Sequence, residues 1–459
     1  MDLCWHRRDL RVTDNRMLAG RNALPVFVLD EAVLEHAAPP RVAFMLDALE
    51  SLREAYRERG GNLLIERGDP SAVVPTLAAE FGVDTVVWNH DYSGLARERD
   101  EAVRAALDER GINHEQYHDA VIHEPGSITT TDGDPYSVFT YFGKKWLDRD
   151  KPDPVSAPES VSDPDDPGGI PALSDLGFEA PEGSVPDAGP DAAENRLETF
   201  CDGPIRRYEE DRDYPSRGGT SRLSVDLKFG TVGIRRVYAA TENAKAEAGS
   251  KEERGSVEEF QSQLAWREFY TQVLYYHPNV VTKNYKTYDG EIEWRTDEEG
   301  FDAWTEGKTG YPIVDAGMRQ LREESWMHNR VRMLVAAFLT KDLLVDWREG
   351  YDWFRKHLVD HDTGNDTGGW QWAASTGTDA QPYFRIFNPM TQGERYDPDA
   401  EYIREYVPEL REVDPKTIHA WHDLDDEARP DVGYPAPIVD HAIRREVAIE
   451  TFERARGEE

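Results

Sequence analysis

Short apolar runs alternate with stretches of helical periodicity over the first 125 residues. Apolar runs at residues 3–5, 26–29, 63–65 and 83–88 predict strands, and apolar spacing of three to four predicts helices at 41–59, 71–81 and 97–110. This alternation predicts a doubly wound α/β domain, a parallel sheet with helices on both faces. No GxGxxG motif follows the first strand, so the usual dinucleotide site is not supported.

The pattern changes in the middle of the chain. Residues 151–191 are rich in Pro, Gly, Ser and Asp, a composition that does not fill a hydrophobic core. We therefore expect residues 126–190 to link two domains. From residue 194 onward helical periodicity dominates, with many Trp, Tyr and Arg, and predicts a larger all-α domain over residues 191–459.

The charge is strongly acidic. Asp and Glu number 90 against 53 Lys and Arg, for a formal charge of −37, and only 12 of the basic residues are Lys. This composition is typical of a halophile, in which molar salt screens the repulsion between surface carboxylates. The alternative is an acidic protein that avoids nucleic acid. At molar salt the long-range repulsion from DNA is also screened, so net charge does not decide the partner.

Other features exclude several protein classes. The longest apolar stretch, residues 335–344, is interrupted by Lys341 and Asp342 and is too short to cross a membrane. The N-terminus has no apolar core of a signal peptide. Two cysteines are too few for a disulfide framework, and the histidines have no metal-ligand spacing. We expect a cytoplasmic monomer without a metal.

Four segments of the second half carry chemistry: GTSRLS at 219–224, WREFY at 266–270, WMHNRVRM at 326–333 and GGWQWAASTGTDAQPYFRIFNP at 368–389. Each alone has an ordinary explanation. The hydroxyls of the first would serve as a helix N-cap, the aromatic residues would pack in a core, and the arginines would form a solvated face or hold phosphates.

Together these segments resemble the DNA photolyase/cryptochrome family of blue-light flavoproteins, in particular its microbial class I cyclobutane pyrimidine dimer photolyases. WHRRDLRVTDN at 5–15, EGKTGYPIVDAGMRQL at 306–321 and KDLLVDWREG at 341–350 follow the same order and spacing. The resemblance covers nearly the whole chain outside the linker. It implies FAD in the helical domain and blue-light repair of dimers in UV-damaged DNA by an electron from reduced flavin.

The resemblance also implies the residues that hold FAD. Those implied to bind its phosphates are Tyr208, Thr220, Ser221, Arg222, Leu223 and Ser224. Those implied to border its adenine, ribose and flavin are Arg267, Asn329, Asp360, His361 and Asp362. Hydroxyl and backbone donors suit a pyrophosphate, and an arginine near the flavin would stabilise its anionic reduced form.

A second implied group faces the DNA. Trp266 and Trp372 match the indoles that sandwich a flipped-out dimer, and Met333 lines the same cavity. The implied contacts to the DNA backbone or the substrate at the cavity mouth are Arg212, Arg330, Arg385 and Gln392. The implied electron-hopping chain from flavin to surface is Trp370, Trp347 and Trp294.

Two positions depart from the pattern of repairing members. Gln263 stands where they carry Glu three residues before the WREFY Trp, and glutamine has no acidic proton to donate, so we expect slower repair. Asp366 stands where they carry Asn, although Asn365 is adjacent and a shift of one residue would restore it. In an apolar site the pKa of Asp366 would rise. These positions support an alternative, a cryptochrome-like photoreceptor with little or no repair.

A second chromophore, an antenna, is also implied. Folate-binding members carry an Asn-Glu pair after the strand that ends near Trp88, whereas this chain has Leu95 and Ala96 there. We therefore expect an 8-hydroxy-deazaflavin, rather than a folate, in the first domain.

Overall fold

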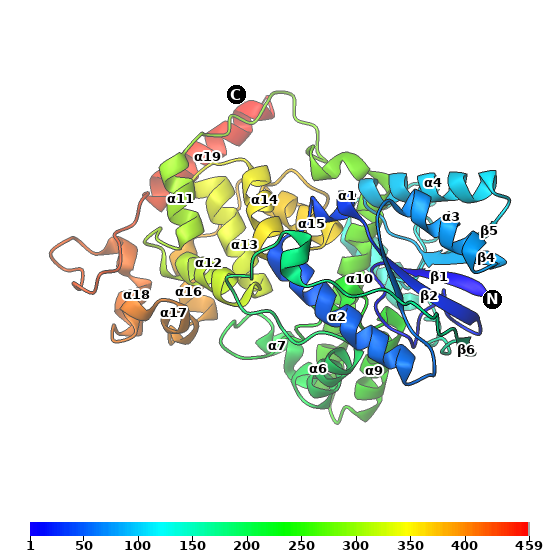
Figure 1. Ribbon diagram of the computed structural model, residues 1–459. Helices are drawn as coiled ribbons and strands as arrows, with labels where there is room; N and C mark the ends of the chain where they lie inside the picture. The colour runs from blue at the N-terminus through cyan, green and yellow to red at the C-terminus, as the bar shows by residue number, and fades with distance from the viewer. Residues whose placement is uncertain (458–459) are drawn as a thin grey trace.

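The α/β domain is built on a parallel sheet. In this computed structural model, which describes residues 1–457, the strand order is β3-β2-β1-β4-β5, with β6 beside β2 (Figure 1). Helix α2 packs on the face that carries Cys4 and Phe27, and α3 and α4 pack on the face that carries Trp5 and Val86. The doubly wound fold is confirmed. The elements are β1 Asp2–His6, β2 Asn22–Leu29, α1 Glu31–Leu34, α2 Pro39–Arg57, β3 Leu64–Arg67, α3 Pro70–Glu80, β4 Thr85–Asn89, α4 Gly94–Glu109, β5 Asn113–Tyr117 and β6 Ser160–Val161.

Two strands were not predicted. β5 has the sequence NHEQY and lies at an edge of the sheet, where none of its residues is fully buried, so it carries no apolar signal. β6 is only two residues long and pairs with β2 at Asn22 and Ala23. Both strands form because the edge of a sheet offers unpaired backbone groups.

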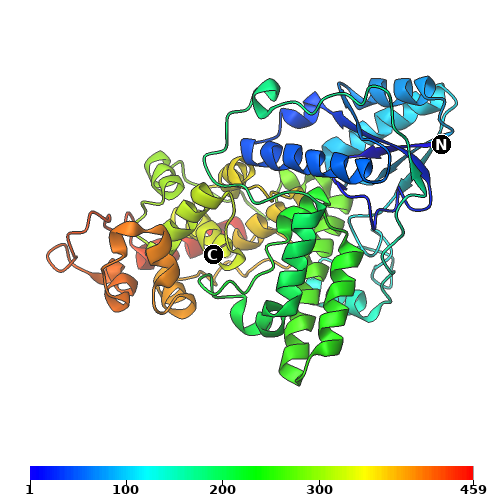
Figure 2. The same ribbon diagram turned by 60° about the horizontal axis from the view of Figure 1, so that its bottom comes forward.

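The second domain is helical, as predicted; its long helix α10 packs against α9, which in turn packs against α6 (Figure 2). Its main helices are α6 Pro190–Asp202, α7 Tyr208–Asp211, α8 Ser224–Phe229, α9 Ile234–Glu247, α10 Lys251–Tyr276, α11 Glu298–Glu306, α12 Pro312–Glu324, α13 Asn329–Ala337, α14 Trp347–His357, α15 Thr363–Ala373, α16 Pro389–Tyr396, α17 Glu401–Tyr406, α18 Pro415–His419 and α19 His441–Ala455. Single turns lie at Leu173–Leu176, Pro204–Arg207, Pro278–Val281, Phe338–Asp342, Pro408–Leu410 and Trp421–Asp423.

The predicted linker, residues 126–190, is more than a connection. Helix α5 (Phe139–Asp148) buries Phe142 and Trp146 in the helical core, where Phe142 contacts Phe269 of α10. β6 belongs to the sheet. The segment therefore contributes structure to both domains, and the boundaries at residues 125 and 190 stay predictions.

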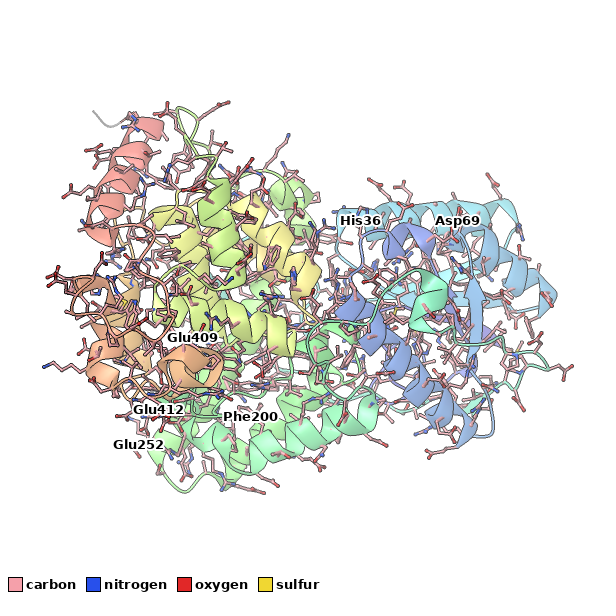
Figure 3. All side chains as sticks on the ribbon, turned by 60° about the vertical axis from the view of Figure 1, so that its left-hand side comes forward. His36, Asp69, Phe200, Glu252, Glu409 and Glu412 are labelled. Atoms are coloured by element: carbon pink, nitrogen blue, oxygen red, sulfur yellow. The ribbon has the colours of Figure 1, made fainter. Side chains whose placement is uncertain are left out.

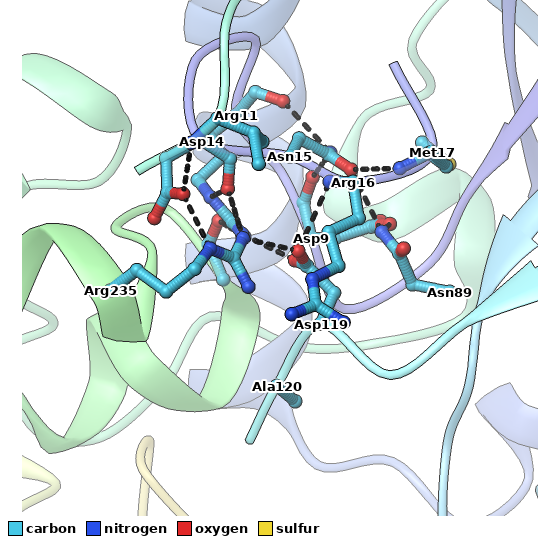
Figure 4. A network of polar contacts seen from close by, with 12 residues as sticks. Asp9, Arg11, Asp14, Asn15, Arg16, Met17, Asn89, Asp119, Ala120 and Arg235 are labelled. Atoms are coloured by element: carbon cyan, nitrogen blue, oxygen red, sulfur yellow. Dashed lines mark hydrogen bonds and ion pairs between the residues drawn. The ribbon is translucent and has the colours of Figure 1, made fainter. Parts of the chain in front are cut away.

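Buried ions join the two domains (Figure 4). Arg235 of α9 donates from Nε to Asp14 Oδ1 at 2.7 Å and pairs with Asp119. Arg11 also pairs with Asp119, and its Nη1 donates to the Gly230 carbonyl at 3.1 Å. All four of these charged side chains are nearly inaccessible to solvent. We call Arg11, Asp14, Asp119 and Arg235 the interdomain clasp.

The acidic residues cover the surface of both domains. Asp69 on the α/β domain and Glu252 and Glu412 on the helical domain are exposed (Figure 3). Within residues 1–457, no helix is long and apolar enough to cross a membrane.

Removing one member of the clasp should destabilise the protein strongly. Asp119→Ala leaves Arg11 and Arg235 without their shared carboxylate, and we expect a loss of about 3–5 kcal/mol in the free energy of unfolding. Denaturant unfolding in molar KCl measures this. Asp108→Ala is the control, because Asp108 is exposed and pairs only with His114; an equal loss in both variants would contradict the prediction.

Acid should weaken the same contact. Burial alone would raise the pKa of Asp119, but Arg11 and Arg235 outweigh it and hold the pKa below the ordinary value of 3.8. The stabilisation by this carboxylate is therefore complete above the ordinary pKa and is lost as the pH falls through the lower pKa of the folded state.

Candidate functional site

The GTSRLS segment borders a cavity of about 280 Å³, which Trp326 and His328 also line. The backbone passes close to a neighbouring helix here, since a Cβ on Gly219 would lie 2.7 Å from Cβ of Asp211. Nε2 of His328 is buried and has no hydrogen-bond partner among residues 1–457. The cavity thus offers hydroxyl, backbone and imidazole groups to a polar ligand such as the pyrophosphate of FAD.

Only some of the residues predicted to bind the FAD phosphates line this cavity. Thr220, Ser221 and Arg222 line this cavity, whereas the Leu223 side chain is buried in the core. Ser224 is exposed at the start of α8, which has no side-chain cap hydrogen bond, so the N-cap interpretation of GTSRLS is wrong. Tyr208 is buried with its ring 5.2 Å from that of Phe260.

A charged cluster surrounds the start of α15. Nη2 of Arg332, on α13, donates to both carboxylate oxygens of Asp360, at 2.8 and 3.0 Å. Arg332 is therefore not free to hold a phosphate. Asp366 Oδ2 lies 2.6 Å from His361 Nδ1 and accepts the Asp362 N–H at 3.1 Å. The expectation that Asp366 lies in an apolar site is therefore wrong.

Asp362 links this cluster to the α/β domain. It caps α15 by accepting from the Asn365 N–H at 3.1 Å, and it pairs with Arg8 across the domain boundary. Burial opposes ionisation of Asp362, but Arg8 and Arg267 outweigh it and hold its pKa far below the usual value. Nearby, Arg267 donates to the carbonyls of Ala120 at 2.7 Å and Leu227 at 3.1 Å. Asn329 is exposed at the first position of α13.

Helices α10 and α15 pack closely where α15 carries glycines. A Cβ on Gly368 would lie 2.2 Å from the Tyr270 ring, and one on Gly364 would lie 3.2 Å from the Tyr270 carbonyl. In a helix the side chain points toward the N-terminus and the carbonyl toward the C-terminus. The Tyr270 ring meets Gly368 and the Tyr270 carbonyl meets Gly364, so α15 runs in the direction opposite to α10. Trp266 and Trp372, each one turn from this contact, therefore lie on the same side of it.

One face of the Trp266 indole is covered by an aromatic ring. Its indole stacks on Phe139 of α5, with ring centroids 3.7 Å apart and planes 11° from parallel. The Phe139 N–H donates to Asp379 Oδ2 at 3.2 Å, in the loop that follows α15. Trp372 lies 6.2 Å from Phe387, and Met333 of α13 is partly buried.

The three tryptophans of the expected chain share one hydrophobic core. Trp370 and Trp347 are buried, and Trp294 is partly exposed at the edge of the same cluster. α14 packs on α15 so closely that a Cβ on Gly350 would lie 2.1 Å from Trp370. Trp347 is one turn from Gly350, and its Nε1 donates to Asn284 at 2.9 Å. Trp294 is thus the most exposed of the three, and their role in electron transfer stays a prediction.

The predicted DNA-facing side chains lie in acidic surroundings. Arg212 pairs with Glu259, which also accepts from Gln263 Nε2 at 2.9 Å. Arg330 pairs with Asp213 at 2.7 Å. Arg385 and Gln392 lie before and within α16.

A larger cavity of about 660 Å³ lies between the domains, at the carboxyl ends of β1 and β2. In doubly wound sheets ligands bind at such ends, near the point where the strand order reverses, here between β1 and β4. Leu95 and Ala96 line this cavity, as does Arg99, whose buried Nε and Nη2 make no hydrogen bond to the part of the chain described. The cavity is large enough for a tricyclic chromophore.

Family models match both domains. One described as the FAD binding domain of DNA photolyase matches residues 260–454, and one described as DNA photolyase matches residues 2–159. The deoxyribodipyrimidine photo-lyase of Halobacterium salinarum is 60% identical over 481 residues and covers 100% of both chains. That of a Synechococcus strain is 43% identical, covering 96% of this chain and 94% of its own.

The chain belongs to the DNA photolyase family. A class III photolyase structure from Agrobacterium tumefaciens superposes with a TM-score of 0.91 at 35% identity, covering 99% of this chain and 98% of the other. An archaeal photolyase from Sulfolobus tokodaii, described with two FAD molecules, has a TM-score of 0.85 at 33% identity and covers 99% and 100%. FAD-dependent DNA photorepair is thus the activity of this photolyase.

These comparisons support some of the sequence-based predictions and leave others untested. The salt-adapted composition fits the Halobacterium relative. Nothing in the comparisons favours the cryptochrome alternative, although a Synechocystis cryptochrome shares the fold with a TM-score of 0.89 at 25% identity, covering 98% and 99%. Membership of class I stays a prediction.

Sequence reasoning missed several residues that contact the predicted site residues. Phe139 lies in the segment expected to be a linker, and Glu259 appears in the sequence only as one more acidic residue. Arg8 belongs to a motif whose contact with Asp362 no local pattern reveals. The spacing of Phe139 and Trp146 along α5 is the only signal that would have indicated a packed helix there.

Removing the stacked ring should loosen Trp266. With Phe139→Ala we expect roughly a three- to tenfold weaker affinity for dimer-containing DNA, because the lost stacking is worth about 0.5–1.5 kcal/mol. Binding in the dark by fluorescence anisotropy measures this. Tyr141→Ala on the same helix is the control, since Tyr141 is 65% exposed; equal effects of both substitutions would refute the positioning role.

Proposed function

We propose that this photolyase repairs cyclobutane pyrimidine dimers in UV-damaged DNA as a monomer. The observation that carries the proposal is the antiparallel contact of α10 and α15, which puts Trp266 and Trp372 on one side of the crossing. Two indoles so placed can stack on an extruded dimer and return part of the stacking energy that the DNA loses. The full-length similarity to deoxyribodipyrimidine photo-lyases supports the substrate.

The FAD phosphates would lie in the cavity of GTSRLS. Thr220 and Ser221 supply hydroxyl donors, the backbone approaches closely at Gly219, and the buried Nε2 of His328 makes no hydrogen bond within residues 1–457. Tyr208, Arg222, Leu223 and Ser224 complete the phosphate side. Arg267, Asn329, Asp360, His361 and Asp362 would border the rest of the cofactor. When bound and reduced, FAD supplies the electron that blue light drives into the dimer.

In this proposal Asp366 would have a structural role. His361 and the Asp362 N–H hold its carboxylate, and Arg332 lies 3.8 Å away, so it fixes the start of α15. The support that Asp366 gave to a photoreceptor role assumed an apolar site, which these polar contacts contradict. Trp370, Trp347 and Trp294 would carry electrons from the surface inward, since Trp370 and Trp347 are buried and Trp294 is partly exposed.

At the cavity mouth, Gln263, Met333, Arg212, Arg330, Arg385 and Gln392 would meet the dimer and its backbone. The Gln263 amide is oriented by Glu259, which accepts from its Nε2. It can hydrogen-bond to a base carbonyl but cannot supply a proton.

The direct test is repair of a dimer-containing oligonucleotide by the fully reduced protein under blue light in molar KCl. We expect many turnovers. Gln263→Glu should raise repair per photon by up to about tenfold, because a carboxyl beside Glu259 has a raised pKa and stays protonated.

Trp266→Ala serves as the negative control, because it removes one wall of the dimer site. Absence of repair by an FAD-loaded wild-type protein that photoreduces normally would refute the proposed function. A Gln263→Glu rate equal to that of wild type would refute only the role of the missing proton.

An antenna is the second part of the proposal. We infer that the 660 Å³ interdomain cavity holds an 8-hydroxy-deazaflavin rather than a folate, since Leu95 and Ala96 line it in place of a polar pair. Arg99 lies near Asp30 and Asp100, at 3.9 and 3.5 Å, and its Nε and Nη2, which make no hydrogen bond within residues 1–457, could donate to a carbonyl or anionic oxygen of the chromophore. The cavity lies across the domain boundary, so an occupant would contact both domains.

Filling this cavity should remove only the antenna. Leu95→Trp is tolerated sterically, because Leu95 is 38% exposed, and we expect it to abolish binding of added 8-hydroxy-deazaflavin. The action spectrum of repair would then lose the antenna band and keep the flavin band. Val33→Thr, a small change in the same lining, is the matched control; unchanged binding in Leu95→Trp would place the antenna elsewhere.

A further inference from the structure

The arginines proposed to meet DNA already have anionic partners in the free protein. Arg212 of the α7 region pairs with Glu259 of α10, and Arg330 of α13 pairs with Asp213 at 2.7 Å. Both carboxylates are about one-third exposed, so solvent and a ligand can reach them. The partners come from different elements, which means that the tertiary fold, and not local sequence, makes the pairs.

Aromatic rings hold the same guanidinium groups from another side. Arg212 lies over Tyr208, 5.5 Å from the ring centroid, and Arg330 lies over Tyr396 at 4.4 Å. A guanidinium fixed by a ring keeps its place when its anion changes. Carboxylate and phosphate offer similar oxygen geometry to the arginine fork, so one can replace the other.

We propose that Glu259 and Asp213 are internal counter-ions that occupy the phosphate positions of Arg212 and Arg330, and that DNA phosphates displace them. The proposal rests on the DNA-binding role given to these arginines above. Each displacement frees one carboxylate, which then takes up a cation from solution.

This exchange changes how binding depends on salt. A protein that meets DNA with free arginines releases condensed counter-ions, and the logarithm of its affinity falls with a slope of about −0.9 per phosphate against the logarithm of salt. Here each cation released by a phosphate is offset by one taken up by a freed carboxylate. The affinity should therefore fall much less with KCl, which suits a chain of charge −37 whose composition indicates molar salt.

Glu259 also connects this exchange to the dimer cavity. The same carboxylate that pairs with Arg212 accepts from Gln263 Nε2 at 2.9 Å. Displacement by a phosphate thus leaves Glu259 bound only to the amide that faces the dimer.

The test is dark binding of a dimer-containing oligonucleotide by the FAD-loaded protein over a series of KCl concentrations. For Asp213→Asn and Glu259→Gln we expect tighter binding at the lowest salt and a slope steeper by up to about 0.9 for each carboxylate removed. Glu258→Gln is the matched control. It removes the same charge from the same helix, but Glu258 pairs with Lys245 at 2.9 Å and with no DNA-facing arginine.

Three outcomes are distinguishable. A steeper slope in both variants, with Glu258→Gln unchanged, supports the proposal. Slopes that stay at the wild-type value overturn it, and if Arg330→Gln still weakens binding, the DNA-binding role stands without internal counter-ions. Wild-type affinity in Arg330→Gln overturns the role of the arginine itself. Thermal unfolding and FAD content of every variant verify the fold, and the two carboxylates give independent readings.

Discussion

The fold depends on a set of charges buried between its two domains. Asp14 and Asp119 from the α/β domain lie between Arg11 and Arg235, and each side chain has lost almost all contact with water. Burying such ions is costly unless every one is paired, so this arrangement tolerates only one relative position of the domains. Arg8 and Asp362 repeat the principle nearer the proposed flavin site, where the α/β domain fixes the start of α15.

Arginine–carboxylate pairs have a different role at the surface. The net charge of −37 would repel DNA at low salt, but the arginines that face the proposed dimer cavity are kept in place by carboxylates and aromatic rings. Local geometry thus decides the partner that overall charge leaves open. An acidic protein can in this way retain a phosphate-binding surface without exposing unpaired cations.

The fold was predictable because its signals are local, and short motifs were enough to propose candidate site residues. Apolar runs located β1 to β4, and short motifs located Trp266, Trp372 and the GTSRLS cavity. The polar edge strand β5 carried no such signal. The surroundings of Asp366, the stack of Phe139 on Trp266 and the pairing of Glu259 all come from contacts between distant segments, which periodicity does not encode.

The most direct measurement is a crystal structure of the FAD-loaded protein with a dimer-containing duplex, grown in molar KCl. We expect the dimer between Trp266 and Trp372, phosphates on Arg212 and Arg330, and the carboxylates of Glu259 and Asp213 turned away from them. A dimer bound on another face, or phosphates absent while both arginine–carboxylate pairs stay intact, would contradict this expectation.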